Sequence, residues 1–282
     1  MKFRFIEEKI FKVLMIIATA MIVGGLLAIL GTIIIKGLPS ISWSMISQTP
    51  KGGYYLGKEG GILNAILGSV YLGIGSTLIA VLLSLPVVIY MNVYLKKNSF
   101  FSNALRLCFD VMWGVPSIVY GAFGFTLMVL FGLKTSLLAA IIIVTIVILP
   151  VIIRSVDEII RMISDGLFEA SYSLGATKLQ TSVRVILKQA SPGIITALLV
   201  AFGRAIGDAA AVLFTAGYTD YVPTSLFQSA ATLPLAIFFQ LSTPFPEVQQ
   251  RAIASAFILT MIILITSLLA RYFTRNYKRY RV

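Results

Sequence analysis

The 282-residue chain contains no histidine and only one cysteine, Cys108. Without histidine the chain cannot build a His-based metal site or an imidazole acid–base catalyst, and one cysteine excludes a disulfide within the chain. Charge is scarce as well, because only 12% of the residues are charged, about half the share in a soluble domain. These absences exclude a soluble enzyme with a histidine-dependent site.

What the sequence has instead is long apolar segments. Hydrophobic residues make up 58% of the chain, and the mean hydropathy is +0.95. Six segments reach the roughly 17–25 residues that a membrane-spanning helix needs. They are Val13–Ile35, Ile66–Met91, Val111–Leu133, Leu137–Ile153, Ile194–Gly217 and Ala252–Ala270. We therefore predict an all-α integral membrane protein with six transmembrane helices. The first segment is too long for a signal-peptide core and follows Glu7 and Glu8, so we interpret it as a retained anchor.

The net charge of +12 raises the question of nucleic-acid binding, but the basic residues lie between the apolar segments. They concentrate in the N-terminal tail, in the loops after the second and fourth spans, and at the C-terminus. The opposite side holds only Lys36, Lys51, Lys58, Lys134 and Arg251. Because basic loops stay on the cytoplasmic side of a membrane, we predict a multi-pass protein of the cell membrane with both termini in the cytoplasm.

The uncharged segment Tyr221–Pro246 is ambiguous, because its composition also permits a seventh span. Its four prolines and two glutamines argue against a span, and a seventh crossing would move the basic C-terminus outside. We interpret it as an external loop or a partly re-entrant one.

The longest polar stretch on the predicted inner side, residues 154–190, has the pattern of two helices. Val156, Ile159, Ile160, Ile163 and Leu167 recur at helical spacing. Gly175 suits the residue after a helix C-terminus, and Thr177 with Gln180 forms a capping box for a second helix. The stretch is either an elbow that only connects two spans or a docking element for a cytoplasmic partner.

The motif Glu169-Ala170-Ser171-x-x-x-Gly175, followed by Pro192-Gly193, resembles the EAA loop of ABC importer permeases. Ser171 stands where a second Ala is usual, and Lys188 where Pro is usual. The resemblance implies the six-helix type I importer (MetI-like) fold. It also implies that Glu169, Ala170 and Gly175 couple the chain to a separate ATPase subunit that binds ATP and Mg. The permease core would then comprise residues 61–272, preceded by residues 1–60 with the first helix and followed by a basic tail, 273–282.

Arg204 and Asp208 are the only charged residues in the predicted span Ile194–Gly217. Each costs roughly 2.5–3.5 kcal/mol at the centre of a membrane helix. Their i, i+4 spacing predicts that they share one helix face. Two interpretations remain open: a substrate pathway, in which the Arg204 guanidinium binds oxyanion oxygens, or a buried ion pair that fixes helix packing.

The segment Gly203–Gly217 resembles phosphate importer permeases, most closely the PstA-type subunit, as do Val115–Gly121 and Thr232–Pro234. Asp208 replaces the usual Glu, and Val93 replaces an acid after Asn92. The resemblance implies inorganic phosphate as the transported ion. It also implies a second homologous permease, an ATPase dimer and an external phosphate-binding protein as partners. Pro116 with Ser117 either breaks the third span and exposes backbone donors to the pathway, or only kinks it.

Three alternatives compete with a phosphate importer. The first keeps the machinery but carries sulfate, molybdate or tungstate, and the second is a secondary transporter without an ATPase. The third, a structural or sensory membrane protein, is disfavoured by the intramembrane charges. Gly52-x-x-x-x-Gly57-Lys58 resembles the start of a P-loop, but Glu59 occupies the place of the required Ser or Thr. We therefore predict no ATPase site, no catalytic residues and no metal site in the chain itself.

Overall fold

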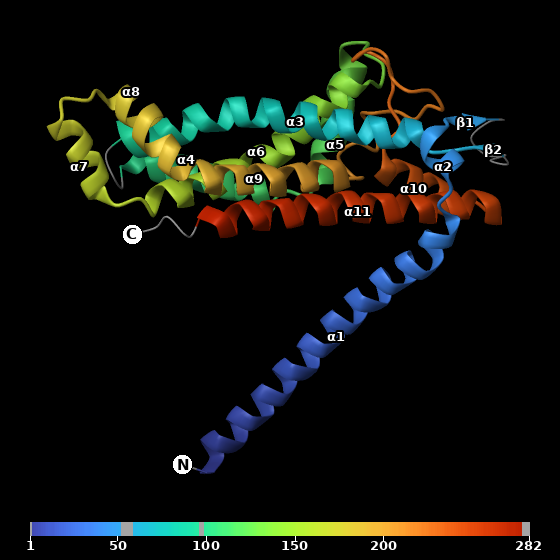
Figure 1. Ribbon diagram of the computed structural model, residues 1–282, viewed down its shortest axis with the longest axis horizontal. Coiled ribbons are helices and arrows are strands. Elements are labelled where there is room, and N and C mark those ends of the chain that lie inside the picture. The colour runs from blue at the N-terminus through green and yellow to red at the C-terminus, as the bar shows by residue number, and fades with distance from the viewer. Residues whose placement is uncertain (1, 52–58, 96–98, 278–282) are drawn as a thin grey trace.

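The computed structural model describes residues 2–51, 59–95 and 99–277, which are mostly helical (Figure 1). In chain order the elements are α1 (Lys2–Ser40), α2 (Trp43–Ser47), β1 (Pro50–Lys51), β2 (Glu59–Gly60), α3 (Leu63–Ile89), the π-helical turn η1 (Tyr90–Tyr94), α4 (Phe100–Gly114), α5 (Ser117–Leu130), α6 (Leu137–Arg161), α7 (Asp165–Ser173), α8 (Lys178–Gln180), the π-helical turn η2 (Thr181–Ile186), α9 (Leu187–Gly207), α10 (Leu233–Leu241) and α11 (Pro246–Tyr277). The short strands β1 and β2 pair antiparallel, Pro50 with Gly60 and Lys51 with Glu59.

Five helices of the described residues are long and apolar enough to span a membrane, and a bent pair, α4 with α5, makes a sixth crossing if counted as one. This confirms the predicted all-α class with six spans. The helices α3, α6, α9 and α11 run side by side as a bundle (Figure 1). The helix α1 diverges from this bundle and meets it only near its C-terminal end, where Gly37 lies against Phe257 of α11.

The centre of the bundle is α6, which packs against α3, α4, α5 and α9. Its Val144, Ile148, Ile152 and Val156 are fully buried. A helix that is apolar on all sides is typical of a buried position. The helix also runs to Arg161, beyond the predicted end of the fourth span at Ile153, so Val156 to Ile160 continue the span rather than start a surface helix.

Small residues along α3 bring other segments close to its backbone. A methyl group at Gly68 would overlap the carbonyl oxygen of Ala231, and the neighbouring Ser69 hydroxyl accepts a hydrogen bond from the N–H of Leu233 at 2.7 Å. One turn further on, Gly73 faces α9 and Gly75 faces α6. These residues therefore serve helix and loop packing.

Two predicted spans are not continuous helices. The helices α4 and α5 meet at Val115–Pro116 with a bend of 91°, so the third span is broken rather than kinked. The predicted fifth span, Ile194–Gly217, was wrong in its second half. The helix α9 ends at Gly207, and residues 209–216 form turns.

The second predicted surface helix is not separate from the fifth span. The segments α8, η2 and α9 form one helix from Lys178 to Gly207 that passes through Pro192. Proline lacks the N–H that would bond the carbonyl four residues earlier, which is that of Lys188. The Ser191 hydroxyl donates to this oxygen at 2.8 Å, so the helix continues without an unpaired carbonyl.

The ambiguous segment Tyr221–Pro246 is a loop followed by α10, whose nine residues are too few to cross a membrane. The helix α10 packs against α3, α9 and α11. A seventh span is therefore excluded. We refer below to the two ends of the bundle as the α7 end and the α10 end, which lie opposite each other in Figure 1.

Candidate functional site

The helix α7 projects beyond the spans at one end of the bundle (Figure 1). The predicted coupling residues Glu169 and Ala170 are exposed on it, and Gly175 is exposed in the following turn. Gly175 adopts φ +81°, a left-handed conformation that favours glycine after a helix end. The predicted capping box is confirmed: the Thr177 N–H donates to Gln180 Oε1 at 2.9 Å, and the Gln180 N–H donates to Thr177 Oγ1 at 3.3 Å.

The residue that departs from the EAA pattern, Ser171, has a structural role. Its buried hydroxyl lies 2.8 Å from the hydroxyl of Thr181 in η2, and either group can donate. Alanine could not make this hydrogen bond. The bond fixes α7 against the long helix that continues as α9, so α7 is held firmly while its outer face stays open.

That outer face is partly apolar, although it lies beyond the membrane spans. Leu174 is 89% exposed, and Met162 and Leu179 are also largely exposed. We define the α7 surface as Met162, Glu169, Ala170, Leu174 and Leu179, all of them exposed.

Arg204 and Asp208 lie on the two sides of the break that ends α9. Arg204 is in the last helical turn and exposed, whereas Asp208 is just past the helix in an extended conformation. The residues described contain no ion pair or hydrogen bond between the two side chains. The prediction that they share one helix face was wrong, because the helix ends between them. The interpretation as a buried ion pair that fixes packing loses its support.

Each of the two charged side chains lies where the neighbouring backbone groups favour its sign of charge. Arg204 lies near the free carbonyls at the C-terminus of α9, where a positive charge is favourable. The Asp208 carboxylate accepts the Ala211 N–H at 2.9 Å, as a capping residue does at the start of a turn. This bond is an alternative to continuing the helix, and it gives a physical reason for the break.

The break in the third span lies next to the break in the fifth. The elbow at Val115–Pro116 is held by Tyr120, whose hydroxyl donates to the Met112 carbonyl at 2.8 Å. A side chain at Gly121 would come within 2.8 Å of the Ala210 and Ala211 carbonyl oxygens, so α5 contacts the turns after Asp208 directly.

Ser117, the third predicted pathway residue, is the first residue of α5 and is half-buried. It lies one turn before Gly121 on the same face of the helix. The chain from α5 onward and the turns after Asp208 also meet further along, where the Ser136 N–H donates a hydrogen bond to the Thr215 carbonyl. Ser117 therefore lies at the N-terminus of α5, one turn from the contact of Gly121 with the turns after Asp208.

One buried carboxylate was missed by the sequence interpretation. The Asp157 side chain is completely buried and accepts hydrogen bonds from Arg106 Nε at 2.8 Å and Arg106 Nη2 at 3.1 Å. It also accepts one from Asn92 Nδ2 at 2.7 Å. A usable signal was present: α4 has Arg106 and Asp110 one turn apart, and α6 has Arg154 and Asp157 in matching order.

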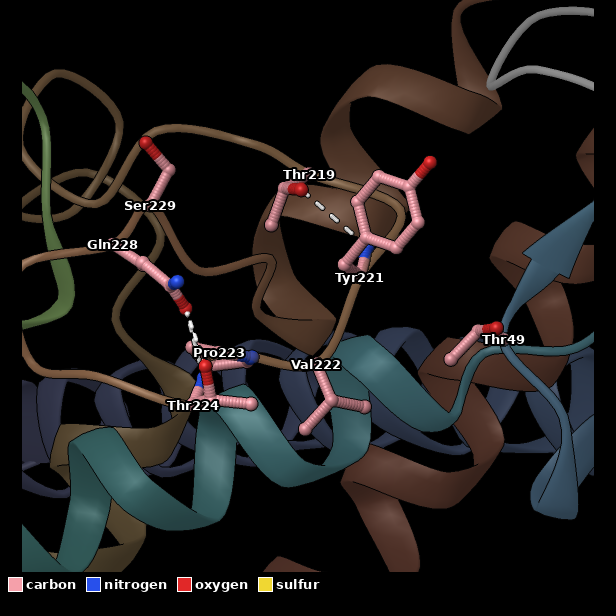
Figure 2. A pocket seen from close by; sticks show the side chains of 8 residues that line it. All are labelled: Thr49, Thr219, Tyr221, Val222, Pro223, Thr224, Gln228 and Ser229. Carbon is pink, nitrogen blue, oxygen red and sulfur yellow. Dashed lines mark hydrogen bonds between the residues drawn. The ribbon is translucent and has the colours of Figure 1, made fainter.

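A hollow of about 590 Å³ lies at the α10 end, at the loop before α10 (Figure 2). Its lining residues, all uncharged, are Thr49, Thr219, Tyr221, Val222, Pro223, Thr224, Gln228 and Ser229. The Gln228 amide oxygen accepts from the N–H and the hydroxyl of Thr224, which orders part of the wall. The hollow does not include Arg204, Asp208 or Ser117, so it is separate from the two breaks.

Beside this hollow, Arg251 is only 6% exposed and donates to the Gly60 carbonyl at 3.3 Å. Burial raises the pKa of the nearby Asp220 carboxyl, and the positive charge of Arg251 offsets part of that rise. These contacts attach the loop before α10 to α11 and to the β1–β2 pair.

Some predictions lie outside the described residues, namely the Gly52–Lys58 motif, Lys96 with Lys97, and the basic tail beyond Tyr277. Among residues 2–51, 59–95 and 99–277, no group of three or more acidic or cysteine side chains is placed to hold a metal ion.

Comparison with known proteins gives consistent matches. The model of the family described as "Binding-protein-dependent transport system inner membrane component" matches residues 85–279. The phosphate transport system permease protein PstA of Xylella fastidiosa (strain Temecula1 / ATCC 700964) is 34% identical over 245 residues, which cover 85% of this chain and 83% of that protein. The PstA of Mycobacterium leprae (strain TN) is 35% identical over 211 residues, which cover 74% of this chain and 68% of that protein.

Two solved structures share the fold. An inward-facing structure of the MetNI methionine ABC transporter covers 75% of this chain and 95% of its own, with 20% identity and a TM-score of 0.57. The crystal structure of an amino acid ABC transporter with histidines matches over 77% of this chain and 93% of its own chain, with 18% identity and a TM-score of 0.54.

Proposed function

Because the chain belongs to the family of binding-protein-dependent transport system inner membrane components, we propose that it is a permease subunit of an ATP-driven importer that carries inorganic phosphate into the cell. The similarity to phosphate permeases over most of the chain supports phosphate as the cargo. ATP and Mg would bind to a partner ATPase, and an extracytoplasmic binding protein would deliver phosphate.

The observation that carries the proposal is the exposed Arg204 at a broken span. Within the described residues its guanidinium has no hydrogen-bond or ion-pair partner, so its donors are free for a ligand. A planar guanidinium with several N–H groups fits the oxygens of phosphate. Interrupted helices in transporters place such groups and free backbone N–H groups at substrate sites.

The exposure of Arg204 also indicates where the pathway lies. A charge on the outside of a single chain would face lipid, which is costly. A second permease subunit packed on this face would enclose Arg204 in a polar pathway between the two chains. We propose that Ser117 and Asp208 line the same pathway, and that Asp208, being an acid, weakens anion binding enough to permit release.

We propose that the α7 surface docks on the ATPase subunit in the cytoplasm. The C-terminal end of α11 and the N-terminal end of α1 both point toward the α7 end of the molecule (Figure 1). This arrangement supports an orientation with α7 and both termini on the cytoplasmic side, as the distribution of basic residues predicts.

Reconstitution tests the proposal. The chain is co-purified with the second permease and the ATPase, placed in proteoliposomes and supplied with binding protein loaded with phosphate, sulfate, molybdate or tungstate. We expect phosphate to stimulate ATP hydrolysis and to accumulate inside. Stimulation by another oxyanion instead would identify a different cargo. Uptake driven by an ion gradient, without a co-purifying ATPase, would favour a secondary transporter.

Changing Glu169 to Lys should weaken binding of the ATPase subunit. The substitution reverses an exposed charge on the α7 surface without altering the packing of α7. Rim charges of an interface affect association and its salt dependence, and we expect roughly tenfold weaker co-purification. The measurement is the ATPase recovered per permease. Lys134→Glu, which changes an exposed positive charge outside α7 to a negative one, is the control. Equal recovery of the ATPase with both variants would contradict the docking role.

A further inference from the structure

We propose that two crossed ion pairs between α4 and α6 couple the α7 surface to the broken third span. Arg106 of α4 pairs with Asp157 of α6, and Asp110 of α4 pairs with Arg154 of α6. In this proposal they act as positioning residues that make α4 and α6 move together. The inference rests on the proposed function, because it assigns these residues a part in energy coupling.

The geometry of the two pairs is reciprocal. The Arg106 guanidinium donates twice to the buried Asp157 carboxylate, at 2.8 Å and 3.1 Å. In the second pair the cation is on α6 and the anion on α4: Arg154 Nε lies 2.8 Å from Asp110 Oδ1. Arg154 Nη1 also lies 3.8 Å from Asp157 Oδ2. Each helix therefore contributes one cation and one anion, and the alternation of sign fixes their register, since a shift by one turn would bring like charges together.

The amphipathic pattern of α4 points to the same contact. Its Phe100, Leu107 and Val111 are exposed, whereas Arg106 is turned toward α6. A helix against lipid turns its polar side inward. The contact between α4 and α6 therefore combines ion pairs with the apolar packing of Phe109 against the core that α6 helps to form.

A third donor connects the pairs to α3. Asn92 lies in the π-helical turn η1, and its Nδ2 donates to Asp157 at 2.7 Å and to the Val88 carbonyl at 3.0 Å. Single π-turns in helices occur often at functional positions. The buried carboxylate thus joins α6 to α4 and to the π-helical turn that follows α3.

These contacts complete a continuous connection between the docking surface and the pathway. From Asp157, α6 runs one turn to Arg161, and α7 follows after the cap at Ser164. From Asp110, α4 runs one turn to the elbow at Val115–Pro116, and α5 then contacts the turns after Asp208 through Gly121. A displacement of α7 that moves α6 would also move the elbow, provided that the ion pairs hold α4 to α6.

The test uses two acids that flank the same arginine. Asp110 reaches Arg154 from another helix, whereas Glu158 approaches it at 3.8 Å from within α6. Asp110→Asn therefore removes a link between helices, and Glu158→Gln removes the same charge without affecting that link. Asp110 is 46% exposed, so its replacement leaves the buried Asp157 paired and the fold intact. The assay measures phosphate taken up per ATP hydrolysed by the assembled complex, with the binding protein present.

We expect Asp110→Asn to lower the ratio of phosphate imported to ATP hydrolysed at least about fivefold, the lower range of coupling between sites. Asp110→Glu should restore it, and Glu158→Gln should leave it unchanged. An unchanged ratio for Asp110→Asn, or equal losses for Asp110→Asn and Glu158→Gln, would overturn the link while leaving the proposed function intact. Absence of phosphate-stimulated ATP hydrolysis in the unaltered complex would instead overturn the proposed function, and the link with it.

Discussion

Replacing Arg204 with Ala is expected to reduce phosphate uptake by roughly 10–100-fold, because hydrogen bonds to a charged group contribute about 1.5–3 kcal/mol. The chain should fold normally. Arg204 is exposed, and within the described residues its side chain bonds to no other group. The measurement is uptake of labelled phosphate into proteoliposomes at equal amounts of assembled complex.

The matched variants separate charge from geometry. Arg204→Lys keeps the positive charge but loses the planar fork, so its uptake should fall between those of the unaltered chain and Arg204→Ala. Arg271→Ala removes an exposed arginine near the C-terminal end of α11 and should leave uptake unchanged. Unaltered uptake by the Arg204→Ala complex would contradict the pathway role.

The second large effect concerns folding and is expected for Gly68→Ala. The added methyl group would overlap the Ala231 carbonyl, which is backbone and cannot turn away as a side chain can. The segment around Ala231 would have to move off α3 and break the bond between the Ser69 hydroxyl and the Leu233 N–H. Overpacking of this kind costs about 1–3 kcal/mol, and contact with the backbone favours the upper end.

We expect a melting temperature several degrees lower in detergent and reduced accumulation in the membrane. Gly24→Ala is the control, because a methyl group there meets no atom of the described chain within 4 Å. A Gly68→Ala chain as stable as the Gly24→Ala chain would show that the loop accommodates the methyl group.

Hydropathy alone predicted the number of apolar segments of spanning length, because a span needs a long apolar segment whatever its neighbours are, although it did not show that the third is bent or that the helix of the fifth ends at Gly207. Local hydrogen bonds could also be predicted from the sequence, as the capping box of Thr177 and Gln180 shows. Both signals depend on residues close in sequence. Together with the resemblance of the motif, they led to the prediction of Glu169, Ala170 and Gly175 as coupling residues.

The two breaks were harder to predict. Ala209 to Ala216 is as apolar as a helix, so hydropathy does not reveal that Asp208 bonds the Ala211 N–H and ends the regular helix. At Pro116 the residue type predicts a disturbance but not its size, because the 91° bend also depends on the packing of α5. Arg204, Asp208 and Ser117 could therefore be proposed individually as pathway residues from the sequence, but their arrangement could not be predicted.

Asp157 was missed for a different reason. It follows the apolar part of α6, where a charge usually faces water, and the matching Arg and Asp positions on α4 and α6 do not by themselves show that Asp157 is buried. Its partners Asn92 and Arg106 are separated from it by 65 and 51 positions and meet it only through the packing of α3 and α4 on α6. Contacts between distant segments of this kind require a three-dimensional structure.

From the divergence of α1 from the bundle we expect the protein to respond to bilayer thickness. The apolar stretch Val13–Ile35 is about 34 Å long as a helix, against a hydrocarbon core of about 30 Å. Such a helix fits when inclined by about 30°. Within residues 2–51, 59–95 and 99–277, α1 has no neighbour along most of its length, and Gly37 lies against Phe257 of α11. Lipids of different chain length should therefore change the angle between α1 and the bundle.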